Sequence, residues 1–139
     1  MALQYITKDI LTRTSGEALL DLPYDIAFIA GYDKDMVKED VSVRTYGEMV
    51  MARTGEFIGE VGYADTAPTG AVLICDVMKN GTTIYASTKP QFAASATTIT
   101  VGVITTTTFV SGDRISFKVT QIGSGNAGQG VRITLKCRV

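Results

Sequence analysis

Hydrophobic and polar residues alternate most regularly in two stretches near the C-terminus. In residues 113–122 the apolar Ile115, Phe117 and Val119 alternate with Arg114, Ser116, Lys118 and Thr120, and in 131–139 every second position is apolar with charged or hydroxylic residues between. A period of two residues turns one side of a strand to the core and the other to water, so both stretches are predicted to be half-buried strands. Because they are separated only by a glycine-rich loop, we expect them to pair as one long hairpin.

Weaker strand signals fill the preceding part of the chain. These are short apolar or β-branched runs that end at glycines or polar turns, and they cover residues 24–29, 41–52, 57–61, 71–78, 82–86 and 97–109. The second run is interrupted at Gly47 and the last near Gly102. A glycine inside a strand pattern often marks a bulge or a bend.

The dipeptide Asn80-Gly81 is the clearest turn in the sequence. Asn and Gly tolerate the positive φ that both central positions of a type I′ turn need, so we expect a two-residue hairpin here. That closure pairs Lys79 with Thr82 and brings Val77 and Ile84 onto the same face.

About eight short strands and no convincing long helix predict an all-β protein, a jelly-roll-like antiparallel β-sandwich in residues 23–139. Residues 1–22 form a separate N-terminal arm with at most a short helix. Two alternatives remain for the arm: it folds back over its own sandwich, or it reaches onto a partner subunit. The apolar residues of the arm that would make such a contact are Leu3, Tyr5, Ile6, Ile10 and Leu11.

Composition narrows the function by what is missing. The chain has 139 residues, the size of one domain, and contains neither histidine nor tryptophan. Without histidine there is no Ser-His-Asp or Cys-His catalytic arrangement, no common zinc site and no usual general base near neutral pH. We therefore expect a protein that is not an enzyme and that needs no metal or other cofactor.

The two cysteines, Cys75 and Cys137, both lie in apolar runs. Unpaired cysteine behaves as a small hydrophobic residue, so buried free thiols are the favoured interpretation. A disulfide or a shared metal stays open as an alternative.

Charge is nearly balanced overall but unevenly distributed. The formal net charge is −1, and it divides into −7 for residues 1–76 (13 acids, 6 bases) and +6 for residues 77–139 (1 acid, 7 bases). One interpretation is that the outer faces of the strands simply differ in sign. The other is that opposite faces meet on neighbouring copies in an assembly.

The basic residues near the C-terminus lie on the polar side of the two alternating stretches. They are Arg114, Lys118, Arg132, Lys136 and Arg138. Their charges would either discourage edge pairing between molecules or dock onto an acidic surface of a neighbouring protein. A nucleic-acid partner is not expected, because the net charge is acidic and no aromatic residues are interleaved with the bases.

Two local motifs fail on their context. Residues 123–130, GSGNAGQG, contain the spacing G-x-G-x-x-G, but they lead into a strand instead of the helix that a dinucleotide site requires. The acidic turn Asp33, Asp35, Glu39 and Asp40 has interleaved lysines and lacks the calcium-loop pattern, so we expect a solvated turn. No window approaches the roughly 18 apolar residues of a membrane span, and no membrane partner is expected.

Two segments carry a resemblance to a known family. The stretch TAPTGAVLICDVMKNGTTIY at 66–85, with FVSGDRISFKVTQIGSGNAGQGVRITLK at 109–136, resembles a β-sandwich module of tailed-bacteriophage virion proteins. The shared features are a Pro-Thr-Gly start, an Asp followed by a Lys-Asn-Gly-Thr hairpin, a Gly-Asp before a strand, and a Gln-Ile-Gly-Ser loop before the last strand.

The resemblance implies a virion component without catalytic residues. The first hypothesis is a capsid decoration (cement) protein, made in the host cytoplasm, that sits on the capsid surface and bridges subunits of the major capsid protein, itself associated as a homotrimer. The alternative is a host-recognition or glycan-binding module of a tail or head fibre, in which loops 62–70 and 123–130 would contact the glycan.

Overall fold

The computed structural model describes residues 22–139, and these residues form nine β-strands and no helix. The strands are β1 (Ile26–Ala30), β2 (Arg44–Val50), β3 (Gly55–Thr66), β4 (Leu73–Lys79), β5 (Thr82–Thr83), β6 (Gln91–Phe92), β7 (Thr108–Phe109), β8 (Arg114–Gln121) and β9 (Gln129–Arg138).

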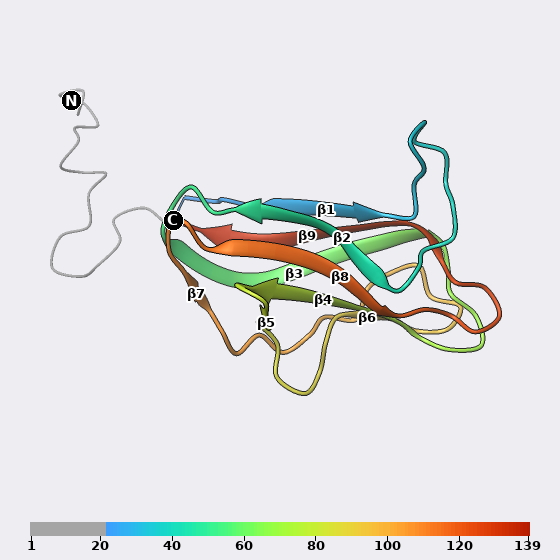
Figure 1. Ribbon diagram of the computed structural model, residues 1–139. Helices are drawn as coiled ribbons and strands as arrows, with labels where there is room; N and C mark the ends of the chain where they lie inside the picture. The colour runs from blue at the N-terminus through green and yellow to red at the C-terminus, as the bar shows by residue number, and fades with distance from the viewer. Residues whose placement is uncertain (1–21) are drawn as a thin grey trace, which may run out of the picture.

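The strands form two antiparallel sheets that pack face to face (Figure 1). One sheet has the order β1-β9-β3-β7; the other has the order β2-β8-β4-β5, with β6 also paired to β4. Successive strands change sheet at almost every step, and two Greek keys interlock in this way in a jelly roll. The all-β, jelly-roll-like sandwich predicted from the sequence is therefore confirmed.

The expected long hairpin near the C-terminus is wrong. β8 pairs with β2 and β4, whereas β9 pairs with β1 and β3, so the two strands lie in different sheets. Their alternation was interpreted correctly, since Ile115, Phe117 and Val119 are buried. Alternation fixes which side of a strand faces the core, but it does not fix which strands are neighbours.

Two glycines mark bulges. The ladder between β2 and β8 shifts register between Thr45 and Gly47, as the interruption at Gly47 predicts. β3 is much longer than the predicted 57–61, because it continues through Gly62 to Thr66. Its own bulge lies at Gly59, which has a φ of 151° and follows Phe57 in a shifted register with β9.

The turn at Asn80-Gly81 has the predicted geometry. Both residues have positive φ, 50° and 86°, and Lys79 faces Thr82. The amide of Ile84 donates to the carbonyl of Val77, and both side chains are buried. The returning strand β5 is only two residues long, so less of the predicted 82–86 strand forms than expected.

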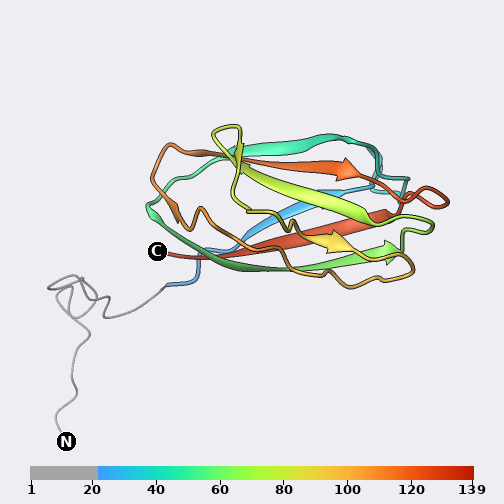
Figure 2. The same cartoon turned by 90° about the horizontal axis from the view of Figure 1, so that it is seen from below.

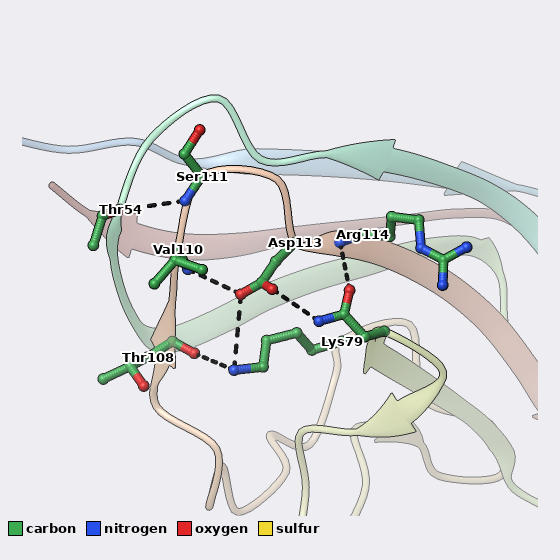
Figure 3. Close-up of polar contacts among 8 residues, drawn as sticks. Thr54, Lys79, Thr108, Val110, Ser111, Asp113 and Arg114 are labelled. Atoms are coloured by element: carbon green, nitrogen blue, oxygen red, sulfur yellow. Dashed lines mark hydrogen bonds and ion pairs between the residues drawn. The ribbon is translucent and has the colours of Figure 1, made fainter.

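This turn is tied to the start of β8 by a polar network (Figure 3). The side-chain amide of Asn80 donates to Asp113 Oδ1 at 2.8 Å, and its carbonyl accepts the backbone N–H of Arg114 at 2.9 Å. Asp113 Oδ2 also accepts the N–H of Val110, and the ammonium group of Lys79 donates to the Thr108 carbonyl. Two loops that are distant in sequence are therefore held together at one end of the sandwich.

Residues 97–107, called the strap below, do not form the strand expected for 97–109. Only Thr108–Phe109 is a strand, and the strap runs beside β3 along one side of the sandwich (Figure 2). The strap hydrogen-bonds to both sheets. The carbonyl of its Thr97 accepts the N–H of Ala64 in β3, and its Thr100 exchanges two backbone hydrogen bonds with Gln91 in β6 of the other sheet. A segment shared between two layers cannot keep a continuous ladder with either one.

The core lies between the sheets and is rich in aromatic contacts. Phe28 of β1 stacks on Phe117 of β8 with ring centroids 5.5 Å apart, which joins the two layers directly. The ring centroids of Phe57 on β3 and Phe109 on β7 lie 4.8 Å apart. Both distances lie in the range that aromatic pairs prefer.

Candidate interaction face

The outer face of the sheet β1-β9-β3-β7 carries exposed apolar side chains. Cross-strand pairing places Ile29, Arg132 and Tyr63 in one row and Ala27, Thr134 and Val61 in the next. Four large side chains on this face are about half exposed, and we call them the apolar face: Ile29, Ile58, Val61 and Tyr63. Exposed apolar groups that gather on one face of a soluble domain mark a surface that binds a partner.

The outer face of the other sheet is different. Its cross-strand pairs are mainly polar, including Thr45 with Lys118 and Glu48 with Ser116. On β4, Asp76 is buried because the hydroxyl of Thr83 and the ammonium group of Lys89 cover its two carboxylate oxygens. The outer face of the second sheet is therefore more polar than the apolar face, although it also carries the exposed Val50.

The structure separates the five basic residues that the sequence placed on one hairpin. Arg114 and Lys118 lie on β8, whereas Arg132, Lys136 and Arg138 lie on β9 in the opposite layer. The predicted single basic surface is therefore wrong, for the same reason that the predicted hairpin is wrong.

Two of the β9 bases are held by acids of β3 within the same chain. Arg132 donates to both oxygens of Asp65 at 3.0 and 2.9 Å, and Arg138 donates to Glu56 at 2.9 and 2.7 Å. The hydrogen bond from Arg132 lowers the pKa of Asp65 below its ordinary value. The Arg132–Asp65 pair lies on the same face as the apolar side chains, because Arg132 stands between Ile29 and Tyr63 in their row.

The same pairing bears on the two oppositely charged halves. Arg132, Arg138 and Lys89 come from the basic half, and their partners Asp65, Glu56 and Asp76 come from the acidic half. Because β9 lies between β1 and β3, the jelly-roll topology interleaves the halves. Opposite charges meet inside one molecule, without a neighbouring copy.

The arm residues named from the sequence, Leu3, Tyr5, Ile6, Ile10 and Leu11, lie outside the described residues. The described chain begins at Leu22, whose backbone exchanges two hydrogen bonds with Val139, at 3.2 and 2.9 Å. Pro23 then bridges to Arg138, so the chain enters the sheet that carries the apolar face.

The glycine-rich loop 123–130 connects the two sheets and is locked to a neighbouring turn. Thr69 is its main contact: Thr69 N–H donates to the Asn126 carbonyl, and its carbonyl and hydroxyl accept the N–H groups of Gly125 and Asn126. The loop leads into β9, so the context that a dinucleotide site needs is absent here, as predicted. In the predicted loop 62–70, residues 62–66 are instead the end of β3.

The acidic turn is closed by its own backbone. Asp33 Oδ1 accepts the N–H groups of Asp35 and Val37 at 2.8 and 2.9 Å, and Asp40 accepts the side-chain amide of Gln129. The turn is mostly exposed, which agrees with the predicted solvated turn. Within residues 22–139 no group of three or more acidic or cysteine side chains is arranged to hold a metal ion.

Both cysteines are free and buried, which confirms the favoured interpretation over a disulfide. Cys75 lies on β4 and Cys137 on β9, in opposite sheets. Burial raises the pKa of the Cys137 thiol to about 12 and that of Cys75 further. Thiols that stay protonated are poor nucleophiles, so neither is a reactive site.

A pocket of about 440 Å³ opens between β3 and the strap, beside the apolar face. Its walls include Ile58, Ile104 and Lys136, and Glu60 and Gly102 also line it. Glu60 is buried, and one carboxylate oxygen accepts the N–H of Gly102. The sequence did not point to Glu60, although an acid between Gly59 and Val61 in an apolar strand was a visible signal.

The apolar face was also missed, because its residues come from two strands that are far apart in the sequence. The comparisons with protein-family models, with curated proteins and with solved structures give no match for this chain. Among the described residues, no helix has the length and hydropathy needed to cross a membrane.

Proposed function

We propose that this chain is a non-enzymatic structural protein of a tailed-bacteriophage virion, a decoration (cement) protein that binds the major capsid protein and bridges capsid subunits. The observation that carries the proposal is the contrast between the apolar face and the more polar outer face of the other sheet. The resemblance of residues 66–85 and 109–136 to a virion β-sandwich module supports it, and jelly rolls are common among viral capsid domains.

The mechanism is binding alone. Docking the apolar face would remove Ile29, Val61 and Tyr63 from water, and each Å² of apolar surface removed contributes about 25 cal/mol. A protein that binds only the assembled shell stabilises that shell by mass action. No proton transfer or covalent step is needed, and the free thiols and paired acids described above would take no part in binding.

The N-terminal arm supplies a second contact in this proposal. Its first described residue is fixed against Val139 at the end of the sheet that bears the apolar face. A fully extended segment of 21 residues spans at most about 70–75 Å. The arm and the face would then engage different subunits, which is how one small protein bridges two.

Two matched variants test the role of the face. Val61→Glu places a charge on the apolar face, and Val50→Glu places the same charge at a similarly exposed valine on the outer side of the other sheet. We expect Val61→Glu to weaken binding to assembled shells at least about tenfold and Val50→Glu to leave it unchanged. Equal binding by both variants would remove the face from the proposal.

The location of the protein tests the proposal as a whole. Antibody labelling of intact virions should show copies distributed over the head, and labelling confined to the tail would contradict a decoration protein. In the same shell-binding assay, a chain lacking residues 1–20 should lose binding while keeping its fold. A truncated chain that still decorates shells would show that the arm is not a contact.

One observation favours a second candidate, a glycan-binding module of a fibre. The turn that follows β3 and the loop 123–130 do lie together, joined through Thr69 and Asn126, so they form one preformed tip. Binding to host surface glycans that is lost when Asn126 is changed, but not when Val61 is changed, would favour this candidate over the first.

A further inference from the structure

The backbone contact between β3 and the strap is interrupted in the middle. At one end Ala64 donates to Thr97 and Ile99 donates to Gly62, and at the other end Phe57 donates to Thr107. Between Gly62 and Phe57, no backbone hydrogen bond joins these two fully described segments. The pocket of about 440 Å³ opens at this interruption.

Glu60 makes the one polar link across the gap. Its side chain turns inward from β3, opposite the buried Leu135, and one oxygen accepts the N–H of Gly102 in the strap. Gly102 has no room for a side chain, since an added Cβ would lie 2.7 Å from the Tyr85 ring and 2.8 Å from Pro90. The strap is therefore pressed against Tyr85 where Glu60 holds it.

This link has an unusual polar environment. Glu60 and Tyr85 are each only 3% exposed, and neither Glu60 Oε2 nor the Tyr85 hydroxyl has a hydrogen-bond partner among the described residues. A buried carboxylate with an unpaired oxygen costs free energy, and the cost is removed when the group takes up a proton. Buried polar atoms without partners are rare enough to need an explanation.

Every element around Glu60 affects this balance. Burial raises the pKa of Glu60. The Gly102 N–H, the positive charge of Lys136 on β9 and the Tyr85 hydroxyl, which is near Glu60 but not within hydrogen-bond distance of it, oppose that rise. Burial raises the pKa of Tyr85 so far that its hydroxyl stays neutral, and electrostatic interactions with Glu60 and with Asp76 and Cys75 of β4 raise that pKa further. Of Glu60 and Tyr85, Glu60 is therefore the one that changes charge first as pH rises.

We propose that Glu60 is a proton-dependent latch for the strap. While the carboxyl is protonated, it holds Gly102 without placing a charge in the core, and the strap stays closed between Ile99 and Thr107. When the proton leaves, the charge is solvated by water entering through the adjacent pocket, and the strap opens locally. The change is a loss of one proton to solvent, with no other reactant.

The direction follows from the linkage between protonation and folding. The pKa of Glu60 is higher in the folded chain than in the unfolded one. The stabilisation by the protonated latch is therefore complete below the unfolded value and is lost as pH rises through the folded value. The strap should be tight in acid and loose in alkali, opposite to the behaviour of an ordinary ion-paired carboxylate.

Amide hydrogen exchange of the full chain tests the latch, after correction for the intrinsic chemical rate. Between about pH 5 and about pH 9 we expect the protection of amides 99–106 to fall about tenfold or more, while the β8 and β9 amides keep theirs. In Glu60→Gln, which keeps an acceptor for Gly102 but cannot ionise, strap protection should not depend on pH. Glu56→Gln removes a partly exposed acid, paired with Arg138, from the same strand and should leave the pH dependence of the strap as in wild type.

Lys136→Gln provides a second, directional test should Glu60→Gln fail to fold. It removes the positive charge that favours the ionised form, so loosening of the strap should move to higher pH. Strap protection that is independent of pH in the wild type would overturn the proposal. So would a loss shared equally with β8 and β9, or an unchanged pH dependence in Glu60→Gln or in Lys136→Gln.

Discussion

At the scale of single residues, the clearest structural device is Asn80. Its backbone takes the positive φ that the type I′ turn needs, and its side chain bonds to Asp113 and to the N–H of Arg114. The sequence predicted the first role from the Asn-Gly dipeptide. It could not predict the second, because the partners are more than thirty residues away.

Two substitutions separate these roles of Asn80. Asn80→Gly keeps the backbone conformation and loses only the side-chain bonds, so it should cost about 1–3 kcal/mol of unfolding free energy. Asn80→Ala loses the same bonds and adds the strain of a positive φ, about 1 kcal/mol more. Chemical denaturation should rank wild type above Asn80→Gly and Asn80→Ala lowest. A glycine variant as stable as wild type would mean that the network in Figure 3 contributes nothing.

At the scale of elements, the sequence predicted strands well and their neighbours poorly. The burial alternation of β8 and β9 follows directly from period-2 patterning, and the bulge near Gly47 follows from one glycine. Pairing is decided by loop paths and by packing between layers, which leave little trace in local pattern. The loop 123–130 therefore looked like the tip of a hairpin, although it crosses between sheets.

At Gly123 the loop that crosses between the sheets packs tightly against neighbouring backbone. A Cβ at Gly123 would overlap the Asn126 carbonyl and lie 2.9 Å from the Thr69 backbone, whereas a Cβ at Gly47 would meet nothing within 4 Å. We expect Gly123→Ala to lower the unfolding free energy by about 1–3 kcal/mol and Gly47→Ala to change it by less than about 0.5 kcal/mol. Thermal unfolding of both variants compares them directly, and similar melting temperatures would show that the loop adapts freely.

The strap illustrates a second limit on prediction from sequence. Its β-branched residues predicted a strand at 97–109, and most of the segment is extended beside β3. It does not become a ladder strand because its hydrogen bonds alternate between the two sheets. Glu60 was missed for the same reason: its importance comes from Gly102 and Tyr85, which only the three-dimensional fold brings to it.

At the scale of the whole molecule, the topology changes the meaning of the charge distribution. The sequence divides into halves of −7 and +6, which could have been a signal for assembly by charge. Interleaving places Asp65 against Arg132 and Glu56 against Arg138 inside one chain. The apolar face is one of the exposed apolar parts of the described surface, and contacts made through it should be hydrophobic.

Salt distinguishes these two modes of assembly. Raising the ionic strength from about 0.1 M to about 1 M shortens the Debye length from about 10 Å to about 3 Å and weakens contacts between charged surfaces. If the apolar face makes the contact, both shell binding and the proposed homotrimer, measured by light scattering after size exclusion, should persist or strengthen in high salt. Dissociation in salt would instead mean that paired charges such as Arg132 and Asp65 exchange partners between molecules, and that the division of charge along the chain drives assembly after all.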